Sequence, residues 1–552
     1  MPPRLLPYGD DGMLVEVDDL DAVRSLDRAL RAALPPGVVD VVPAARTVLV
    51  RGDARRRAAW SAAVAARATS GDRGSGTRPD RVVDVPVVYD GEDLEDVARV
   101  TGLSVEEVVA RHVAGGPKGY RVAFGGFAPG FAYVVGLDPR LHVPRLATPR
   151  TRVPAGAVAV AGEFTAVYPA ASPGGWRLLG TTTVVMFDAV RGRDAAARLA
   201  PGDVVRFVRH RASAVVGAAP PAPLAPDADA GSAVRTRGEV AAGGPAGRSP
   251  AVGGGVSVLA TGPLVLVEDL GRPGLADVGV PRSGAADPAA LRRANRLVGN
   301  RADAAGLEVV LGGLVLRVEV TTALAVTGAH AAADLDGVPV PHGAAIRAPA
   351  GATLTLAPPR SGLRSWVALR GGVDVPAVLG SRSADVLSGL GPAAVRAGDL
   401  LPLGRDVDGF PELPVPDGAA ADPAAGGVVG GVAGHPGPVV VLPALDGPRL
   451  DRLDAPGRAR LWSTVWAVSP ASNRVAVRLV GEPLTRGVAD ELASEGLVAG
   501  AVQVPHDGRP LLFGADHPVT GGYPVVAVLT AAGRALAAQL QPGQRVRLTR
   551  AV

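Results

Sequence analysis

With 552 residues, 47% of them hydrophobic, the chain is long enough for three or four domains with packed cores. Its 73 glycines and 51 prolines exclude a long coiled coil, since both destabilise helix interiors, and the absence of cysteine excludes disulfides, cysteine zinc sites and cysteine nucleophiles. A net charge of only +4 and an aromatic content of 3% predict that nucleic acid is not a partner.

The N-terminal residues lack the apolar stretch of a secretory signal, because Asp10 and Asp11 interrupt them. We also expect no membrane partner, because no stretch is long and apolar enough for a spanning helix. The lack of cysteine fits a reducing compartment, so the sequence predicts a cytoplasmic protein.

The first half combines short strands with two helices. Apolar residues at helical spacing predict a helix over 93–101 that ends at Gly102. Ser104 and Glu107 form the S-x-x-E pattern of a capping box, which predicts a second helix directly after it. Alternating apolar residues bounded by Gly or Pro predict strands at 82–88 and 204–208.

The second half has one clear helix signal and more short strands. Asp287 followed by Pro288 predicts a helix start, and Gly299 predicts its end. Alternation predicts strands at 314–320, 353–356, 475–479, 525–529 and 546–548. Many short strands separated by turns are typical of closed or sandwiched β structure.

Two segments rich in Ala, Pro and Gly, 213–254 and 407–437, are predicted to be linkers. They leave three folded parts, 1–212, 255–406 and 438–552. The first and last parts also resemble each other in three blocks that occur in the same order and at matched spacing. These blocks pair 153–162 with 497–505, 172–180 with 519–527, and 199–208 with 540–549. We infer that the two halves contain distant copies of one β-rich unit.

The single lysine, Lys118, excludes several kinds of site. A P-loop needs Gly before its Lys, and a biotin carrier needs Met beside it, but Pro117 and Gly119 flank this one. Any bound phosphate must therefore be held by arginine, backbone N–H groups or a metal.

Three segments of the first half are candidates for ligand contact. In 119–137, Gly126 and Gly130 lie among aromatic residues, which indicates either a tight hydrophobic turn or a loop whose amides bind an anion. Arg145 and Arg150 belong either to a solvated basic loop or to an anion clamp. The turn-rich 168–176 adds the candidate binding residues Gly174 and Gly175.

The second half supplies the candidate acid–base groups. Asp516 beside His517 is the best general acid/base pair by composition, although a lone loop histidine more often has a structural role. Asp287 is most simply a helix cap, with catalysis as the alternative. No His-x-x-x-His pair exists, so no protein metal site is predicted. The remaining candidates are Asn473, Arg474, Gln503, Thr520, Gly521, Gly522 and Tyr523.

Long motifs in both halves resemble known families. GGFAPGFAYVVGL, VPRLATPRTRVPAGAVAVAG and YPAASPGGWRLLG in the first half resemble the B subunit of 5-oxoprolinase, also called allophanate hydrolase subunit 1. VEDLGRPGLADVGVPRSGAADPAALRRANRLVGN, SPASNRVAVRLVGEPL and DHPVTGGYP in the second half resemble the companion C subunit, also called subunit 2. The chain therefore resembles a fusion of the two.

The resemblance implies a mainly β, α+β fold with short helices and a cyclophilin-like β-barrel in each half. On this pattern, 1–80 is a small α/β subdomain, 81–212 and 438–552 are the barrels, and 255–406 is a further β-rich subdomain.

The resemblance also implies an activity. This would be ATP-dependent hydrolysis of 5-oxo-L-proline, a small-molecule substrate, to L-glutamate, with a separate 5-oxoprolinase A subunit as partner. Arg145, Arg150 and Arg474 would then contact phosphate or carboxylate, and Asp516 or Asp287 would bind Mg²⁺.

Two other functions fit the same resemblance. One is the carboxyltransferase domain of urea carboxylase, which would need a separate biotinylated carrier because this chain has no carrier lysine. The other is a regulatory pair in which one member inhibits a sensor kinase and its partner counteracts it. Fusion argues against that switch, since it would hold the two members together permanently.

Overall fold

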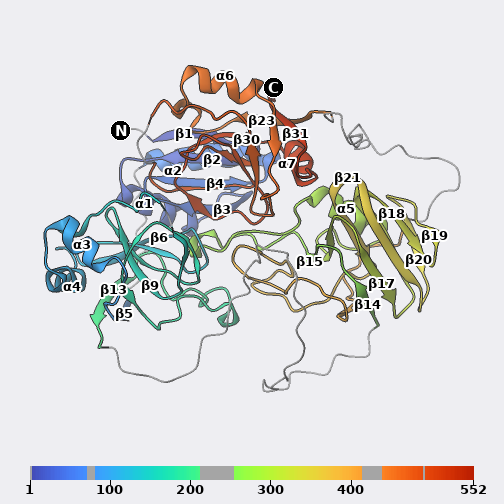
Figure 1. Cartoon of the computed structure of the whole chain (residues 1–552), viewed down its shortest axis with the longest axis horizontal. Helices are drawn as coiled ribbons and strands as arrows, with labels where there is room; N and C mark the ends of the chain where they lie inside the picture. Colours follow the sequence, from blue (N-terminus) through green and yellow to red (C-terminus); the bar gives the residue numbers. More distant parts are fainter. Residues whose placement is uncertain are drawn as a thin grey trace.

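The computed structural model describes residues 3–70, 81–148, 150–211, 254–412, 438–488 and 492–551 (Figure 1). Strands make up 38% and helices 18% of the structure, which confirms the expected mainly β fold with few helices. The predicted linkers 213–254 and 407–437 lie outside the described residues, apart from Gly254 and 407–412. No helix among the described residues has the length and apolar character that crossing a membrane requires.

The N-terminal part is a four-stranded antiparallel sheet, in the order β1-β2-β4-β3, with two helices. Helix α1 begins where the Asp19 side chain accepts a hydrogen bond from the Ala22 amide, and it buries Val23, Leu26 and Leu30 against the sheet. The elements are β1 Arg4–Tyr8, β2 Gly12–Glu16, α1 Leu20–Ala32, β3 Val38–Pro43, β4 Thr47–Gly52 and α2 Arg57–Ser70.

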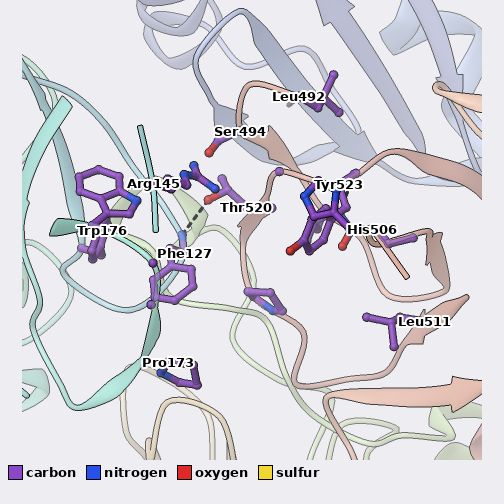
Figure 2. Close-up of a pocket in the computed structure, with 18 of the residues that line it drawn as sticks. Phe127, Arg145, Pro173, Trp176, Leu492, Ser494, His506, Leu511, Thr520 and Tyr523 are labelled. Atoms are coloured by element: carbon purple, nitrogen blue, oxygen red, sulfur yellow. Dashed lines mark hydrogen bonds between the residues drawn. The ribbon is translucent and has the colours of Figure 1, made fainter. Parts of the chain in front are cut away.

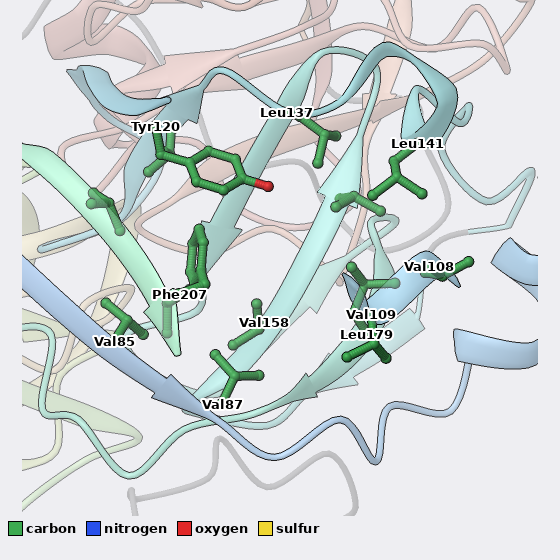
Figure 3. Close-up of a cluster of buried hydrophobic side chains, with 14 of the residues drawn as sticks. Val85, Val87, Val108, Val109, Tyr120, Leu137, Leu141, Val158, Leu179 and Phe207 are labelled. Carbon is green, nitrogen blue, oxygen red and sulfur yellow. The ribbon is translucent and has the colours of Figure 1, made fainter. Parts of the chain in front are cut away.

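The first barrel has the strand order β12-β9-β10-β7-β6-β13-β5, and the bridge between Val88 and Thr181 closes it. Alternate residues of these strands point inward and fill the barrel with Val, Leu and aromatic side chains (Figure 3). The predicted capping box of Ser104 and Glu107 is present. The elements are β5 Val82–Val87, α3 Leu94–Thr101, α4 Val105–Ala114, β6 Tyr120–Gly125, β7 Ala132–Val135, β8 Arg150–Val153, β9 Ala157–Ala161, β10 Phe164–Val167, β11 Ser172–Gly174, β12 Arg177–Thr181 and β13 Val204–Arg209.

The middle part is a nine-stranded sheet with its own core, drawn in green and yellow in Figure 1. Helix α5 packs on strands β18 and β21, and Asp287 caps it as predicted. The elements are β14 Gly255–Ala260, β15 Leu264–Glu268, α5 Pro288–Leu297, β16 Gly306–Val310, β17 Leu314–Val318, β18 Thr322–Leu335, β19 Val338–Pro339, β20 Ala345–Ala348, β21 Thr353–Leu369 and β22 Leu400–Pro402.

The last part is a closed barrel with the strand order β23-β30-β27-β28-β25-β24-β31. Its interior is filled by another hydrophobic cluster, which includes Leu442, Trp466 and Val526. The elements are β23 Val440–Asp446, α6 Ala455–Ser463, β24 Trp466–Val468, β25 Ala476–Val480, β26 Glu495–Gly496, β27 Ala501–Gln503, β28 Leu511–Phe513, β29 Thr520–Gly521, β30 Val525–Leu529, α7 Ala531–Ala538 and β31 Arg545–Arg550.

The two barrels share one topology. In each, the first and last strands are parallel neighbours, as β5 with β13 and β23 with β31. The remaining strands follow in corresponding order, so that β9 matches β27 and β12 matches β30. The side pairs β8–β11 and β26–β29 also correspond. The three resembling blocks fall on matching strands, which confirms the inference that the halves contain copies of one unit.

The N-terminal sheet packs against the last barrel rather than standing alone, as the blue and red ribbons of Figure 1 show. Tyr8 donates a hydrogen bond to the Gly496 carbonyl, at 3.0 Å. Arg449 contacts Glu16 at 3.0 Å and also pairs with Glu495. The N-terminal sheet therefore forms part of the surface against which the last barrel packs.

Candidate functional site

A cavity of about 590 Å³ lies between the two barrels, and both contribute to its lining (Figure 2). Phe127, Arg145 and Trp176 come from the first barrel, while Thr520 and Tyr523 come from the last. Its size is within the range of small-molecule sites. We call it the inter-barrel pocket.

Corresponding glycine loops face this pocket from each barrel. Gly174 and Gly175 precede β12, and Gly521 and Gly522 precede β30. A Cβ on Gly174 would lie 2.3 Å from the Tyr168 hydroxyl, so the loop can pass this ring only as glycine. The resembling blocks 172–180 and 519–527 thus form opposite walls of one pocket.

The loop between β6 and β7 joins the barrels at the edge of the pocket. The Phe127 amide donates a hydrogen bond to the Thr520 hydroxyl, at 2.8 Å. A Cβ on Gly126 would lie 2.6 Å from the same oxygen, and the Gly130 amide donates to the Val278 carbonyl at 2.9 Å. Gly126 and Gly130 therefore serve the contact between halves, while Phe127 lines the cavity.

The pocket combines apolar walls with cations. Arg145 is exposed and makes no hydrogen bond or ion pair within the described residues. Its Nη1 lies 3.5 Å from the position of a Cβ on Gly522, which places the guanidinium beside the glycine loop. Arg486 also lines the pocket and contacts the His506 ring at 3.1 Å. An apolar ligand with an anionic group would match this lining.

Gln503 supplies a buried amide at the wall of the pocket. Its Nε2 donates to the Tyr523 carbonyl at 2.9 Å, which fixes the side chain and leaves its carbonyl oxygen as an acceptor. Gln503 is only 2% exposed. A buried acceptor of this kind can orient a ligand N–H group.

Arg150 lies outside the pocket lining. Its Nη2 contacts Asp93 Oδ1 at 2.7 Å and its Nε lies 3.4 Å from Glu92. These ion pairs hold β8 to the start of α3, so the structure gives Arg150 a role in the barrel rather than in the pocket.

Arg474 and Asp516 belong to a buried ion cluster. Arg474 donates to Asp516 Oδ2 at 2.8 Å, to Glu308 Oε1 at 2.6 Å and to the Gly284 carbonyl at 2.7 Å. Asp516 is fully buried and also accepts hydrogen bonds from Ser283 and Val386. Both side chains are thus occupied by protein partners.

His517 does not form an acid–base pair with Asp516 in this structure. Its Nδ1 contacts the Pro518 carbonyl at 2.8 Å, which requires the proton on Nδ1. Burial lowers the pKa of His517 to about 4, so the ring is neutral at pH 7 and a weak base. It lines a second cavity of about 300 Å³, together with Asn473 and Arg474.

Asp287 serves as the cap of α5. Its Oδ1 accepts from the Ala290 amide at 3.0 Å, and its Oδ2 accepts from Gln539 at 3.2 Å. Burial raises its pKa. The simpler of the two sequence interpretations, a helix cap, therefore matches its contacts.

Comparison with known proteins assigns the two halves. The model of the carboxyltransferase domain, subdomain C and D, matches residues 3–197, and that of subdomain A and B matches 278–550. The chain is 37% identical over 294 residues to the 5-oxoprolinase C subunit of Escherichia coli (strain K12), covering 53% of this chain and 89% of that protein.

The chain belongs to this family of carboxyltransferase-domain proteins.

The first half of this family member is similar to subunits of the B type. It is 44% identical over 132 residues to the 5-oxoprolinase B subunit of Bacillus subtilis (strain 168), a match that covers 23% of this chain and about half, 53%, of that relative. The crystal structure of TTHA0988 matches the chain throughout, with 34% identity, a TM-score of 0.76, and coverage of 98% of this chain and 99% of that one. The findings are consistent with a fusion of types B and C, as the motifs predicted.

Several pocket residues of this family member were not among the sequence candidates. Ser494, His506 and Phe513 come from three separate segments of the last barrel. The sequence around these three residues matches no binding motif, so only the folded structure shows that they line the same pocket. Tyr168 and Trp176, which also line the pocket, are the two ends of the turn-rich segment 168–176 that the sequence analysis singled out.

Proposed function

We propose that this chain is the B–C component of an ATP-dependent 5-oxoprolinase, which opens 5-oxo-L-proline to L-glutamate together with a separate A subunit. The observation that carries the proposal is that relatives of both halves are named as 5-oxoprolinase subunits. The pocket that both halves build together explains why the two types would act as one unit.

The chemistry requires an activated lactam, because amide resonance makes the ring carbonyl a poor electrophile. ATP would supply a phosphoryl group to the lactam oxygen. One water then adds to the ring carbon and the C–N bond breaks, so that the nitrogen keeps the electron pair and takes a proton. A second water releases phosphate from the acyl phosphate that remains. Two waters are consumed, and the products are glutamate, ADP and phosphate, so the atoms balance.

The inter-barrel pocket has the groups that the lactam needs. Arg145, which has no partner among the described residues, suits the carboxylate of 5-oxoproline, and the apolar walls suit its ring methylenes. The Gln503 oxygen can accept the lactam N–H, and the glycine loops allow backbone amides to approach the reacting oxygen.

Mg²⁺ would enter this reaction on the phosphate oxygens of ATP. Within the described ranges, no group of three or more His, Asp or Glu side chains is arranged to hold a metal ion. Asp516 and Asp287, the expected ligands, are committed to Arg474 and to the α5 cap. We therefore propose no dedicated protein site for the metal and no step through one.

The second candidate function is transfer of a carboxyl group to a urea-like amide, which the family model's name favours. A pocket with an arginine and a buried amide would serve such a substrate too. Since Lys118 lacks the setting of a biotin attachment site, the biotin would come from a separate carrier.

The test combines the purified chain with the A subunit from the same organism, ATP, Mg²⁺ and 5-oxoproline, and measures glutamate and ADP. We expect both products in equal amounts, dependent on both proteins. Carboxylation of a urea-like amide by a biotinylated carrier, without formation of glutamate, would instead support the carboxyltransferase. Formation of neither glutamate nor ADP would overturn the proposal.

A further inference from the structure

We propose that the second cavity is a binding site for a phosphate-bearing anion, separate from the inter-barrel pocket. The cavity measures about 300 Å³ and is lined by six arginines and one carboxylate. We call it the arginine cavity, and its charged residues are Asp11, Arg51, Arg282, Arg292, Arg364, Arg474 and Arg534. The existence of a phosphate site does not depend on the proposed function. The further inference that the bound phosphate belongs to a nucleotide does rest on the proposed function.

Four parts of the chain meet at the arginine cavity. Arg51 and Asp11 come from the N-terminal sheet, and Arg282 and Arg292 lie before and within α5. Strand β21 contributes Arg364, and the last barrel contributes further lining. Because no single segment carries this charge, the cavity exists only in the folded chain.

Three of the arginines already have carboxylate partners. Arg364 Nε contacts Glu308 at 3.1 Å, and Arg474 is held in the buried ion cluster. Arg51 contacts Asp11 at 2.8 Å, but its Nε is buried and has no hydrogen-bond partner among the described residues. These pairs neutralise part of the lining and leave one buried donor of Arg51 unused.

The other three arginines have no carboxylate partner within the described parts of the chain. Arg282 Nε reaches only the Leu270 carbonyl at 3.3 Å, and Arg534 Nη1 reaches only the Leu529 carbonyl at 3.4 Å. Arg292 is exposed and has no such contact. The cavity therefore carries a surplus of three positive charges, which favours a polyanion over a single carboxylate.

Nearby carboxylates attract these arginines but form no ion pair with Arg282 or Arg534 within the described residues. Asp10 accepts from the Ala531 amide at 2.9 Å and Asp40 accepts from the Gly274 amide at 2.6 Å, and neither lines the cavity. Burial is the main cause that lowers the pKa of Arg282 and of Arg534; Asp11 acts in the opposite direction on both, and Arg51 repels both. This repulsion between fixed cations would be relieved by an anion held among them.

A glycine gives the Arg534 side chain room in the lining. The stem of Arg534 passes over Gly500, where a Cβ would lie 2.8 Å from its Cγ and force it aside. His517, which is neutral, also lines the cavity and adds no charge. Phe513 lines both cavities, so phosphates in the arginine cavity would be neighbours of a ligand in the inter-barrel pocket.

Calorimetry on the whole chain tests the proposal, with inorganic phosphate, tripolyphosphate, ATP and adenosine as probes, and with neither a partner protein nor 5-oxoproline present. We expect saturable, salt-sensitive binding of tripolyphosphate, weakened about tenfold or more by Arg534→Gln and by Arg292→Gln. The matched control is Arg547→Gln, an exposed arginine on β31 outside the cavity, which should leave binding unchanged. Arg292 is exposed, so that variant keeps the fold even if Arg534→Gln does not.

The probes separate the two sources of phosphate. Binding of ATP and tripolyphosphate, both weakened by the substitutions, with adenosine inactive, identifies a nucleotide polyphosphate. Equal affinity for inorganic phosphate identifies free phosphate, and still supports the site. Absence of saturable binding, or binding unaffected by either cavity substitution, would overturn it. The experiment measures binding and not glutamate formation. Its result would therefore still decide whether the phosphate site exists if the 5-oxoprolinase proposal failed.

Discussion

At the residue scale, Arg145 and Arg150 show how the surroundings of an arginine determine its role. Arg145 lies beside the Gly522 loop without any carboxylate partner in the described structure, whereas Arg150, five residues later, is paired with Asp93. Both arginines looked alike in the sequence. Their different surroundings make Arg145 the proposed ligand cation and Arg150 a structural one.

We therefore expect Arg145→Gln to weaken binding of the carboxylate substrate about tenfold or more, because it removes a charge-assisted hydrogen bond. The effect should appear in KM rather than kcat if the contact is made equally in the ground and transition states. Steady-state kinetics checks this, with the exposed Arg152→Gln as the matched control. Equal kinetics of the two variants would contradict the assignment.

His517 gives a second prediction at this scale. Its pKa is about 4 in the fold and about 6.5 when unfolded, so the unfolded chain binds more protons between these values. The contribution of this residue to stability is therefore complete above pH 6.5, and about 3 kcal/mol is lost as the pH drops through 4. Chemical denaturation of His517→Gln against pH should lack this component, and a slope identical to that of the unaltered chain would refute the account.

At the scale of elements, the β6–β7 loop and β29 join the two barrels through one hydrogen bond. Thr520 is 1% exposed, and its hydroxyl accepts from the Phe127 amide. Phe127 has a φ of 62°, which few residues other than glycine adopt, so the surrounding contacts must hold this turn in place. The joint thus fixes one wall of the inter-barrel pocket.

Replacing Thr520 by Val should leave the Phe127 amide without a partner and destabilise the chain by about 1–3 kcal/mol. The same change should loosen the pocket and raise KM. Thr520→Ser keeps the hydroxyl and is the control, expected to behave nearly like the unaltered chain. Denaturation and kinetics together check the prediction, which fails if Val is tolerated as well as Ser.

Some elements with strong local signals were predicted, and others were missed. The Ser104–Glu107 capping box and the Asp287 cap are present because each needs only residues a few positions apart. Helices α1, α2, α6 and α7 were missed. The apolar periodicity of α6 and α7 is weak, and contacts with β31 and β23 stabilise them, whereas the Asp19 cap and the apolar face of α1 are local signals that could have revealed it. Packing, rather than propensity, decides helices such as α6 and α7.

At the scale of the whole molecule, the buried ion cluster ties the middle sheet to the last barrel. Arg474 of the barrel contacts Glu308 of β16 and Glu268 of β15, at 2.6 and 3.2 Å. Burial raises the pKa of Glu268 well above its usual range, while the neighbouring carboxylates hold Arg474 charged. The cluster is therefore a joint between domains.

Arg474→Met should destabilise the chain by about 3–5 kcal/mol, because it leaves buried carboxylates without a counter-charge. Adding Asp516→Asn to that variant removes one of those charges and should recover part of the loss. Denaturation of the single and double variants measures this. A single variant as stable as the unaltered chain would show that the cluster contributes nothing to the joint.

The sequence by itself determined seven of the strands, the helices α3, α4 and α5, and the presence of two related units, because these depend on alternation, caps and turns within short segments. It also brought forward the glycine loops that form opposite walls of the pocket. Only the tertiary structure decided which arginines are paired with a carboxylate and which are not. Arg474 is neutralised by Glu308, 166 residues away, while Arg145 and Arg534 form no ion pair in the described structure. A charge's role depends on neighbours that folding brings close, and no local pattern in the sequence records them.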